Sequence, residues 1–144
     1  MYTTKQLEER PYLENVWLAP IQDLVPTEKL RHPLSVETYQ ALFQTGWPAE
    51  VPPIAVLVYN QRREDGSLFE ELNVYNGHHR LVAATLAGLK EIPVINWRKA
   101  VEEGFDDEYL EHVREFRKYN RKRKKQLNGL PSRKPAWLRY KPKP

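Results

Sequence analysis

Apolar residues along this chain follow two different spacings. Short apolar runs predict four strands, at residues 16–18, 54–59, 69–75 and 92–97. The run 54–59 is the most hydrophobic and is rich in β-branched residues, which indicates a buried strand. Helical spacing predicts helices that begin at Ser35, His78 and Asp106. Both kinds of element in one short chain indicate an α/β (α+β) domain.

Turn and cap residues mark where these elements end. The turn signal Asp65-Gly66 predicts a hairpin between the second and third strands, with a loop longer than two residues. Pro93 predicts an edge position, or a strand start, for the fourth strand. The helix from Asp106 has its apolar stripe at Leu110, Val113 and Phe116. That stripe fades near residue 119, and we expect His112 on the helix surface.

Charge is distributed very unevenly along the 144 residues. Residues 117–144 hold 12 of the 23 basic residues and no acidic residue, so residues 1–116 hold the other 11 basic and all 19 acidic residues, a net charge of −8. An acidic body with a basic arm is typical of proteins that contact nucleic acid or another polyanion. We predict a lead-in at residues 1–14, a domain at 15–120 that ends in a C-terminal helix, and a flexible basic tail at 121–144, in which residues 128–144 form an extended arm.

Composition excludes several classes of protein. The chain has no cysteine, so disulfides, cysteine-ligated metal sites and thiol catalysis are excluded. No apolar stretch approaches the roughly 20 residues that a membrane helix needs, and the N-terminus lacks the apolar run of a signal peptide. We therefore predict a cytoplasmic protein with no membrane partner. The sequence leaves the oligomeric state open.

A candidate phosphate site lies between the third strand and the helix that follows it. The N-terminus of a helix leaves backbone amides unpaired, and its dipole adds partial positive charge. Gly77 permits close approach to the backbone, Arg80 can donate two parallel bonds to phosphate oxygens, and the histidines add donors or a general acid or base near neutral pH. The predicted phosphate-binding residues are Asn76, Gly77, His78, His79 and Arg80. The alternative is a plain chain turn with solvated histidines.

A dedicated metal site at this turn is not expected. His78 and His79 are adjacent, so their side chains diverge on a helix instead of sharing one face as residues three or four apart do. The metal ligands, if there are any, stay unknown from the sequence.

The stretch Val74–Val94, VYNGHHRLVAATLAGLKEIPV, resembles the signature of the ParB/sulfiredoxin superfamily. In that family a strand is followed by G-x-[HR]-R, a helix of small residues, and Ile-Pro-Val. The upstream stretch 21–28, IQDLVPTE, is similar to the family's first box, and the helix from Ser35 and the strand PPIAVLV follow in the family's order. The resemblance spans about residues 15–97.

The resemblance implies a ParB/sulfiredoxin-like fold, a small mixed sheet with flanking helices, in which Gly77, His78, His79 and Arg80 hold nucleotide phosphates. It implies ATP, ADP or CTP as the nucleotide, with Mg²⁺ as a possible companion, and Glu28 as a catalytic base like that of the family's small-molecule kinases. Glu28 also follows a turn that leaves an apolar segment, where its side chain could point into a cleft, although a plain surface glutamate is the alternative.

Two branches of the superfamily do not fit. Sulfiredoxin carries a nucleophilic cysteine at the position where this chain has His78. Chromosome-partitioning ParB proteins add a helix-turn-helix and a dimerisation domain, and they carry Glu-Arg-Arg where this chain has His78-His79-Arg80.

Three functions are consistent with the sequence. The first is a ParB-like domain that acts on or along nucleic acid, as a nuclease or NTPase, with a basic tail that contacts phosphates and aromatic rings that stack on bases. The predicted nucleic-acid-binding residues are Arg121, Lys122, Arg123, Lys124, Lys125, Arg133, Lys134, Trp137, Arg139 and Tyr140. The alternative for the tail is a solvated arm, or one that folds onto an acidic partner or the acidic body.

The second function is a nucleotide-dependent kinase of a small, serine-like hydroxyl substrate. Glu28 would accept the hydroxyl proton, and His79 would act in catalysis beside the phosphates. Asn76 replaces the aspartate favoured by that branch, and an amide lacks the charge of a carboxylate ligand for Mg²⁺. The third function is a non-enzymatic DNA- or RNA-binding accessory protein. If the protein is an enzyme, the resemblance implies a phosphoryl-group hydrolase or transferase.

Overall fold

The structure is a computed structural model that describes residues 2–27 and 40–128, with side chains described as far as Lys122. Five strands form one sheet in the order β1-β5-β3-β4-β2. Their bounds are β1 Trp17–Pro20, β2 Leu24–Val25, β3 Ile54–Arg62, β4 Leu68–Asn76 and β5 Glu91–Asn96. The pairs β1–β5 and β3–β4 are antiparallel, whereas β5–β3 and β4–β2 are parallel. The predicted α/β class with a small mixed sheet is therefore confirmed.

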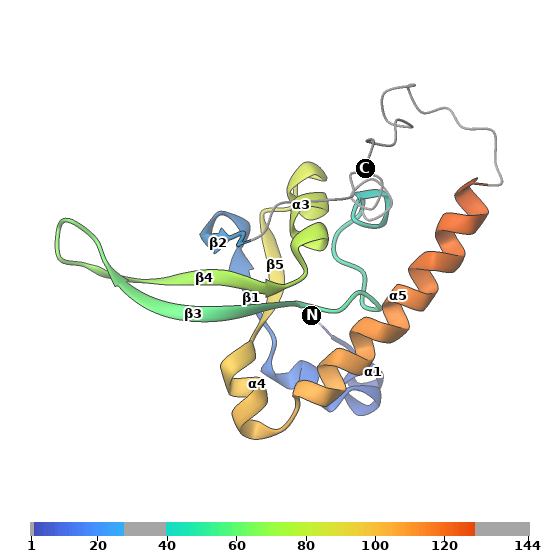
Figure 1. Cartoon of the computed structure of the whole chain (residues 1–144), viewed down its shortest axis with the longest axis horizontal. Coiled ribbons are helices and arrows are strands. Elements are labelled where there is room, and N and C mark those ends of the chain that lie inside the picture. Colours follow the sequence, from blue (N-terminus) through green and yellow to red (C-terminus); the bar gives the residue numbers. More distant parts are fainter. Residues whose placement is uncertain (1, 28–39, 129–144) are drawn as a thin grey trace, which may run out of the picture.

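Helices surround this sheet (Figure 1). The described helices are α1 Thr4–Glu9, α3 His78–Leu86, α4 Trp97–Glu103 and α5 Asp106–Asn128, with short 3-10 helices η1 Pro11–Asn15 and η2 Ile21–Asp23. The predicted starts at His78 and Asp106 are confirmed. Residues 40–42 are helical, but most of the helix predicted from Ser35 lies outside the described residues. Within residues 2–27 and 40–128, no helix is long and apolar enough to cross a membrane.

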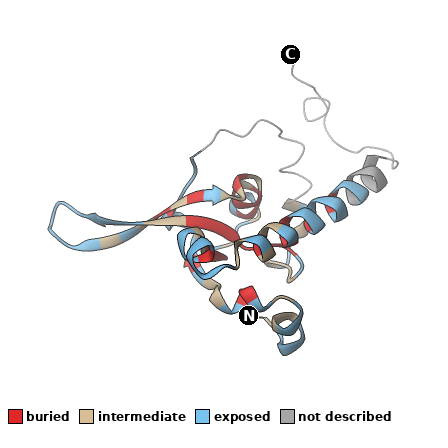
Figure 2. Ribbon diagram, turned by 60° about the horizontal axis from the view of Figure 1, so that its bottom comes forward, coloured by how far each residue is buried: buried red, intermediate tan, exposed pale blue. Residues whose placement is uncertain are grey.

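The two faces of the sheet pack against different helices, because successive strand residues point to opposite sides. Ile54 and Val56 join a core cluster with α3, whereas Ala55 joins a second cluster that includes residues of η1, α4 and α5. Figure 2 shows the buried residues concentrated at the base of β3 and β4, in α3 and along one side of α5. The candidate turn before α3 lies at the end of β4 nearest this core.

Pro93 lies neither in an edge strand nor at the start of its strand, which begins at Glu91, so both alternatives predicted for it are wrong. β5 lies inside the sheet, between β1 and β3. Pro93 is tolerated because β3 pairs with β5 only from Val94 onward, so no bond to β3 is lost at the residue that has no amide hydrogen.

The N-terminal residues, predicted as a lead-in, pack into the second core cluster. Thr3 caps α1 in a capping box with Gln6. Tyr12 and Leu13 of η1 are buried, and Arg10 forms an ion pair with Glu115 of α5. The packed unit therefore begins well before residue 15.

The β3–β4 hairpin extends beyond the rest of the sheet (Figure 1). The sheet partners beside it are short, since β5 pairs with residues 54–56 of β3 and β2 pairs with residues 72–73 of β4. The far part of the hairpin is exposed (Figure 2). Its loop is held by Asp65, which accepts a bond of 2.9 Å from the amide of Ser67.

Helix α5 runs into the segment predicted as a flexible tail. The helix continues to Asn128, so the cations from Arg121 to Lys125 lie on a helix. The positions of residues 129–144 lie outside the described part of the chain.

Candidate functional site

The turn that enters α3 begins with a glycine that no other residue could replace without strain. Gly77 is the N-cap of α3, with φ of +112°, and its carbonyl accepts the amide of Leu81 at 2.8 Å. A Cβ atom at this position would lie 3.0 Å from Nη2 of Arg80 and 3.1 Å from Cγ1 of Ile54. A glycine at the N-cap has no side chain of its own with which to bond the amides of the first turn.

His78, the first residue of α3, is buried and bonded to Thr27, two residues after the end of β2. Its Nε2 lies 3.1 Å from the backbone nitrogen of Thr27 and 3.0 Å from the Thr27 hydroxyl oxygen. That hydroxyl donates to the carbonyl of Val74 at 2.8 Å. A backbone N–H can only donate, so Nε2 is the acceptor and the imidazole is neutral, with its proton on Nδ1. His78 therefore fixes the segment that leads to Glu28 against the candidate turn.

Arg80 is buried, with 4% of its surface exposed, and its guanidinium points into the protein. Its Nη1 donates to the carbonyls of Pro52 and Pro53, and its Nη2 donates to Oδ1 of Asn76 at 3.0 Å and to the hydroxyl oxygen of Tyr109 at 3.2 Å. The Tyr109 hydroxyl in turn donates to the carbonyl of Pro53 at 2.8 Å. The prediction that Arg80 and Asn76 face a phosphate does not agree with this geometry, because these groups bond one another.

The other predicted site residues divide into three groups. Gly77 and His79 are partly exposed at the start of α3, although Nε2 of His79 is itself buried. Arg121 and Lys122 are exposed on α5, and the helix carries Arg123, Lys124 and Lys125, whose side chains are not described. The residues outside the described ranges are Glu28, Arg133, Lys134, Trp137, Arg139 and Tyr140.

Two residues of this site were not singled out from the sequence. Thr27 was visible only as the neighbour of Glu28 in the stretch 21–28. Tyr109 shares helical spacing with Val113 and Phe116, and all three side chains are buried. Leu110 is only partly buried, so the buried stripe of α5 is rotated from the predicted stripe. The spacing was a usable signal for Tyr109, but nothing local indicated that it contacts Arg80.

The prediction that His112 lies on the helix surface is also wrong, because only 1% of its surface is exposed. Its Nε2 lies 3.0 Å from the carbonyl of Glu50, and its Nδ1 contacts the hydroxyl of Tyr12. A carbonyl only accepts, so Nε2 carries the proton and Nδ1 accepts from Tyr12. Burial, aided by the positive charge of Arg10, lowers the pKa of His112 to about 4. This histidine is a structural group that joins η1, α5 and the loop before β3.

The described residues contain no group of three or more histidine, cysteine, aspartate or glutamate side chains that could hold a metal ion. The guanidinium of Arg80, which bonds Pro52 and Asn76, supports the candidate turn from the protein interior.

Comparison with known proteins does not place the chain in a family. No model of a known protein family matches the sequence, and a search of curated proteins finds no match.

Proposed function

We propose that this protein binds a phosphate group of a nucleotide or nucleic acid at the start of α3 and acts on or along nucleic acid. The carrying observation is the entry to α3, where Gly77 has no side chain to cap the helix amides and the ring of His78 is bonded to Thr27. Helix N-termini of this kind favour anions through their amides and their dipole. Membership of the ParB/sulfiredoxin superfamily is part of the same proposal.

Arg80 has a different role in this proposal from the one expected of a phosphate ligand. It braces the turn by joining Asn76 to the carbonyls of Pro52 and Pro53. The amides of the first turn and His79 provide the contacts to phosphate.

The basic end of α5 supports a nucleic-acid partner. Arg121 and Lys122 are exposed, and the chain from residue 117 onward has no acidic residue. Each cation placed against a phosphate adds affinity that depends on salt and not on base sequence.

The first experiment is a thermal-melt panel of the full chain with ATP, ADP, CTP and inorganic phosphate, each with and without Mg²⁺. A ligand at 100 times its dissociation constant adds about 2.7 kcal/mol of stability, which raises the melting temperature by several degrees in a chain of this length. We expect His79→Gln to reduce that shift. Leu86→Gln, an exposed position at the other end of α3, is the matched control and should keep it. If no ligand shifts the melting temperature, the phosphate site is refuted.

The second experiment measures nucleic-acid binding by fluorescence anisotropy over a range of salt concentrations. The double charge reversal Arg121→Glu with Lys122→Glu should weaken binding and reduce the slope of log affinity against log salt by about 0.7–0.9 for each lost phosphate contact. Arg62→Glu with Lys90→Glu changes two exposed cations elsewhere and is the control. Equal loss in both double variants would remove the basic helix from the proposal.

Turnover assays separate binding from catalysis. Labelled DNA and RNA test for nuclease activity, release of phosphate from ATP or CTP tests for an NTPase, and phosphate transfer to free serine tests for a kinase. Glu28→Gln should abolish whichever activity is found and leave binding intact if Glu28 is the base. Binding without turnover in the unmodified chain would identify a non-enzymatic module.

A further inference from the structure

A hollow of about 260 Å³ lies apart from the candidate turn, at the β1–β5 side of the sheet. Leu18 of β1 and Pro93 of β5 line it, and Leu89, just after α3, lies at the opposite end of that helix from Gly77. This volume is below the usual range for drug-sized ligands and suits a group of side-chain size.

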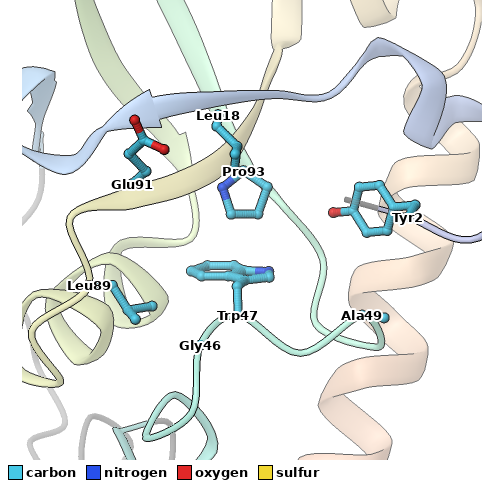
Figure 3. A pocket seen from close by; sticks show the side chains of 8 residues that line it. All are labelled: Tyr2, Leu18, Gly46, Trp47, Ala49, Leu89, Glu91 and Pro93. Carbon is cyan, nitrogen blue, oxygen red and sulfur yellow. The ribbon is translucent and has the colours of Figure 1, made fainter.

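The indole of Trp47 forms a fixed wall of this hollow. Phe43 stacks on it with ring centroids 4.6 Å apart and an angle of 22°, and the indole Nε1 donates to the carbonyl of Val51 at 3.1 Å. Figure 3 shows the indole edge-on, with Pro93 above it and Leu89 to one side. The face of an indole carries negative electrostatic potential and attracts cations.

The two polar groups of the hollow lie on different sides of the indole. Glu91, the first residue of β5, is the one charged residue among the described residues that line the hollow, and it is exposed. On the other side, the hydroxyl of Tyr2 points toward Trp47 and Pro93 (Figure 3). That hydroxyl oxygen is buried and has no hydrogen-bond partner within the described structure. A buried polar atom without a partner costs stability and is best explained by a group that bonds it.

We propose that this hollow binds an alkylguanidinium group. A guanidinium is flat and can lie against the part of the Trp47 indole that Phe43 leaves uncovered, and its fork of N–H groups matches the two oxygens of the Glu91 carboxylate. It also has donors to spare for the hydroxyl oxygen of Tyr2, which can accept. The apolar walls from Leu18, Leu89 and Pro93 suit the alkyl stem. The site is separate from the start of α3, so this inference does not depend on the proposed function.

The test titrates the full chain with N-butylguanidinium and follows the indole N–H of Trp47 by ¹H–¹⁵N NMR, assigned with Trp47→Phe. N-butylurea is a flat neutral control of nearly the same shape, and we expect it to bind at least about tenfold more weakly, since it lacks the charge-assisted bonds. Glu91→Gln should weaken N-butylguanidinium binding by about the same factor, whereas Glu70→Gln on the exposed hairpin should leave it unchanged.

Tyr2→Phe tests the hydroxyl separately and should weaken binding several-fold. Absence of a saturable shift, equal binding of the urea, or full affinity in Glu91→Gln would each overturn the proposal. A peptide amide Gly-Arg-Gly then identifies the source: tighter binding than N-butylguanidinium points to an arginine of a polypeptide, and equal binding points to a small molecule.

Discussion

The guanidinium of Arg80 lies where the oxygens of Pro52, Pro53, Asn76 and Tyr109 converge. Three parts of the chain that are far apart in sequence meet at this one side chain. Four hydrogen bonds from a buried cation to neutral oxygens stabilise the loop before β3, the end of β4 and α5 against each other. At this residue the same donors that suit a phosphate are used to hold the protein together.

Arg80→Lys should therefore destabilise the protein although the charge is kept. A lysine ammonium cannot reproduce the planar fork that reaches both proline carbonyls and Asn76, so buried acceptors lose their donors. We expect a loss of about 2–3 kcal/mol in the free energy of unfolding, measured by urea denaturation. Arg62→Lys, at an exposed position of β3, is the control and should change stability by less than about 0.5 kcal/mol. An unchanged midpoint in Arg80→Lys would show that these bonds contribute little.

His112 makes stability depend on pH in the acid range. The folded protein keeps this imidazole neutral down to a pKa of about 4, whereas the unfolded chain takes up the proton near pH 6.5. The unfolded state thus binds more protons between these values, and stability falls as the pH is lowered from about 6.5 to about 4, by roughly 3 kcal/mol in total. Stability should be insensitive to this group above pH 7.

Urea denaturation of the wild type and of His112→Gln at a series of pH values checks this prediction. The difference between the two proteins isolates His112 from carboxyl groups such as Glu115, whose pKa is lowered by its bond to Arg10. The difference should shrink steadily below pH 6.5. A constant difference between pH 7 and 4.5 would contradict the assignment.

At the scale of elements, the start of α3 depends on the glycine that precedes it. Gly77→Ala places a Cβ in left-handed backbone and 3.0–3.1 Å from Arg80 and Ile54, so strain and crowding add. Gly104→Ala at the end of α4 has φ of +80° but no atom within 4 Å of the added carbon. We expect a loss of about 2–4 kcal/mol for Gly77→Ala and about 1–2 kcal/mol for Gly104→Ala, measured by chemical denaturation. Equal losses would mean that only the backbone angle matters.

The sequence predicted those helices and strands that neighbouring residues alone determine. The apolar run 54–59 and the helical spacing after His78 each identify an element from neighbouring residues alone. Helix α4 was missed because it is seven residues long, although Asn96, which caps it by accepting the amide of Lys99, and Gly104 mark its ends. The interior position of Pro93 depends on where the pairing of β3 begins, which the pattern around Pro93 does not encode.

In the candidate site too, features set by neighbouring residues could be predicted and features set by distant residues could not. Gly77 and His79 are two positions apart in the sequence, and their place at the start of a helix could be predicted from residues 76–80 alone. The inward direction of Arg80 could not, because it results from Pro52, Pro53 and Tyr109, which are 27 to 29 positions away. The burial of His112 likewise depends on Tyr12, 100 positions away along the chain.

At the scale of the whole molecule, the N-terminal segment is part of the packed protein. Leu13 is 3% exposed within the second core cluster, so Leu13→Ala should cost about 2–4 kcal/mol in thermal or chemical unfolding. Leu68→Ala, on a residue 67% exposed at the hairpin, is the matched control and should cost less than about 0.5 kcal/mol. A small loss at Leu13 would indicate that the segment is a detachable lead-in, as its polar sequence first suggested.

The projecting β3–β4 hairpin leaves backbone donors and acceptors along its outer sides, where no described strand lies alongside beyond residues 54–56 and 72–73. Such free edges can recruit a strand from another molecule and start aggregation. The exposed charges of Arg62 and Glu70 oppose that pairing, as gatekeeper residues do. Neutralising them would therefore shorten the time the protein stays in solution at high concentration while leaving its folded core unchanged.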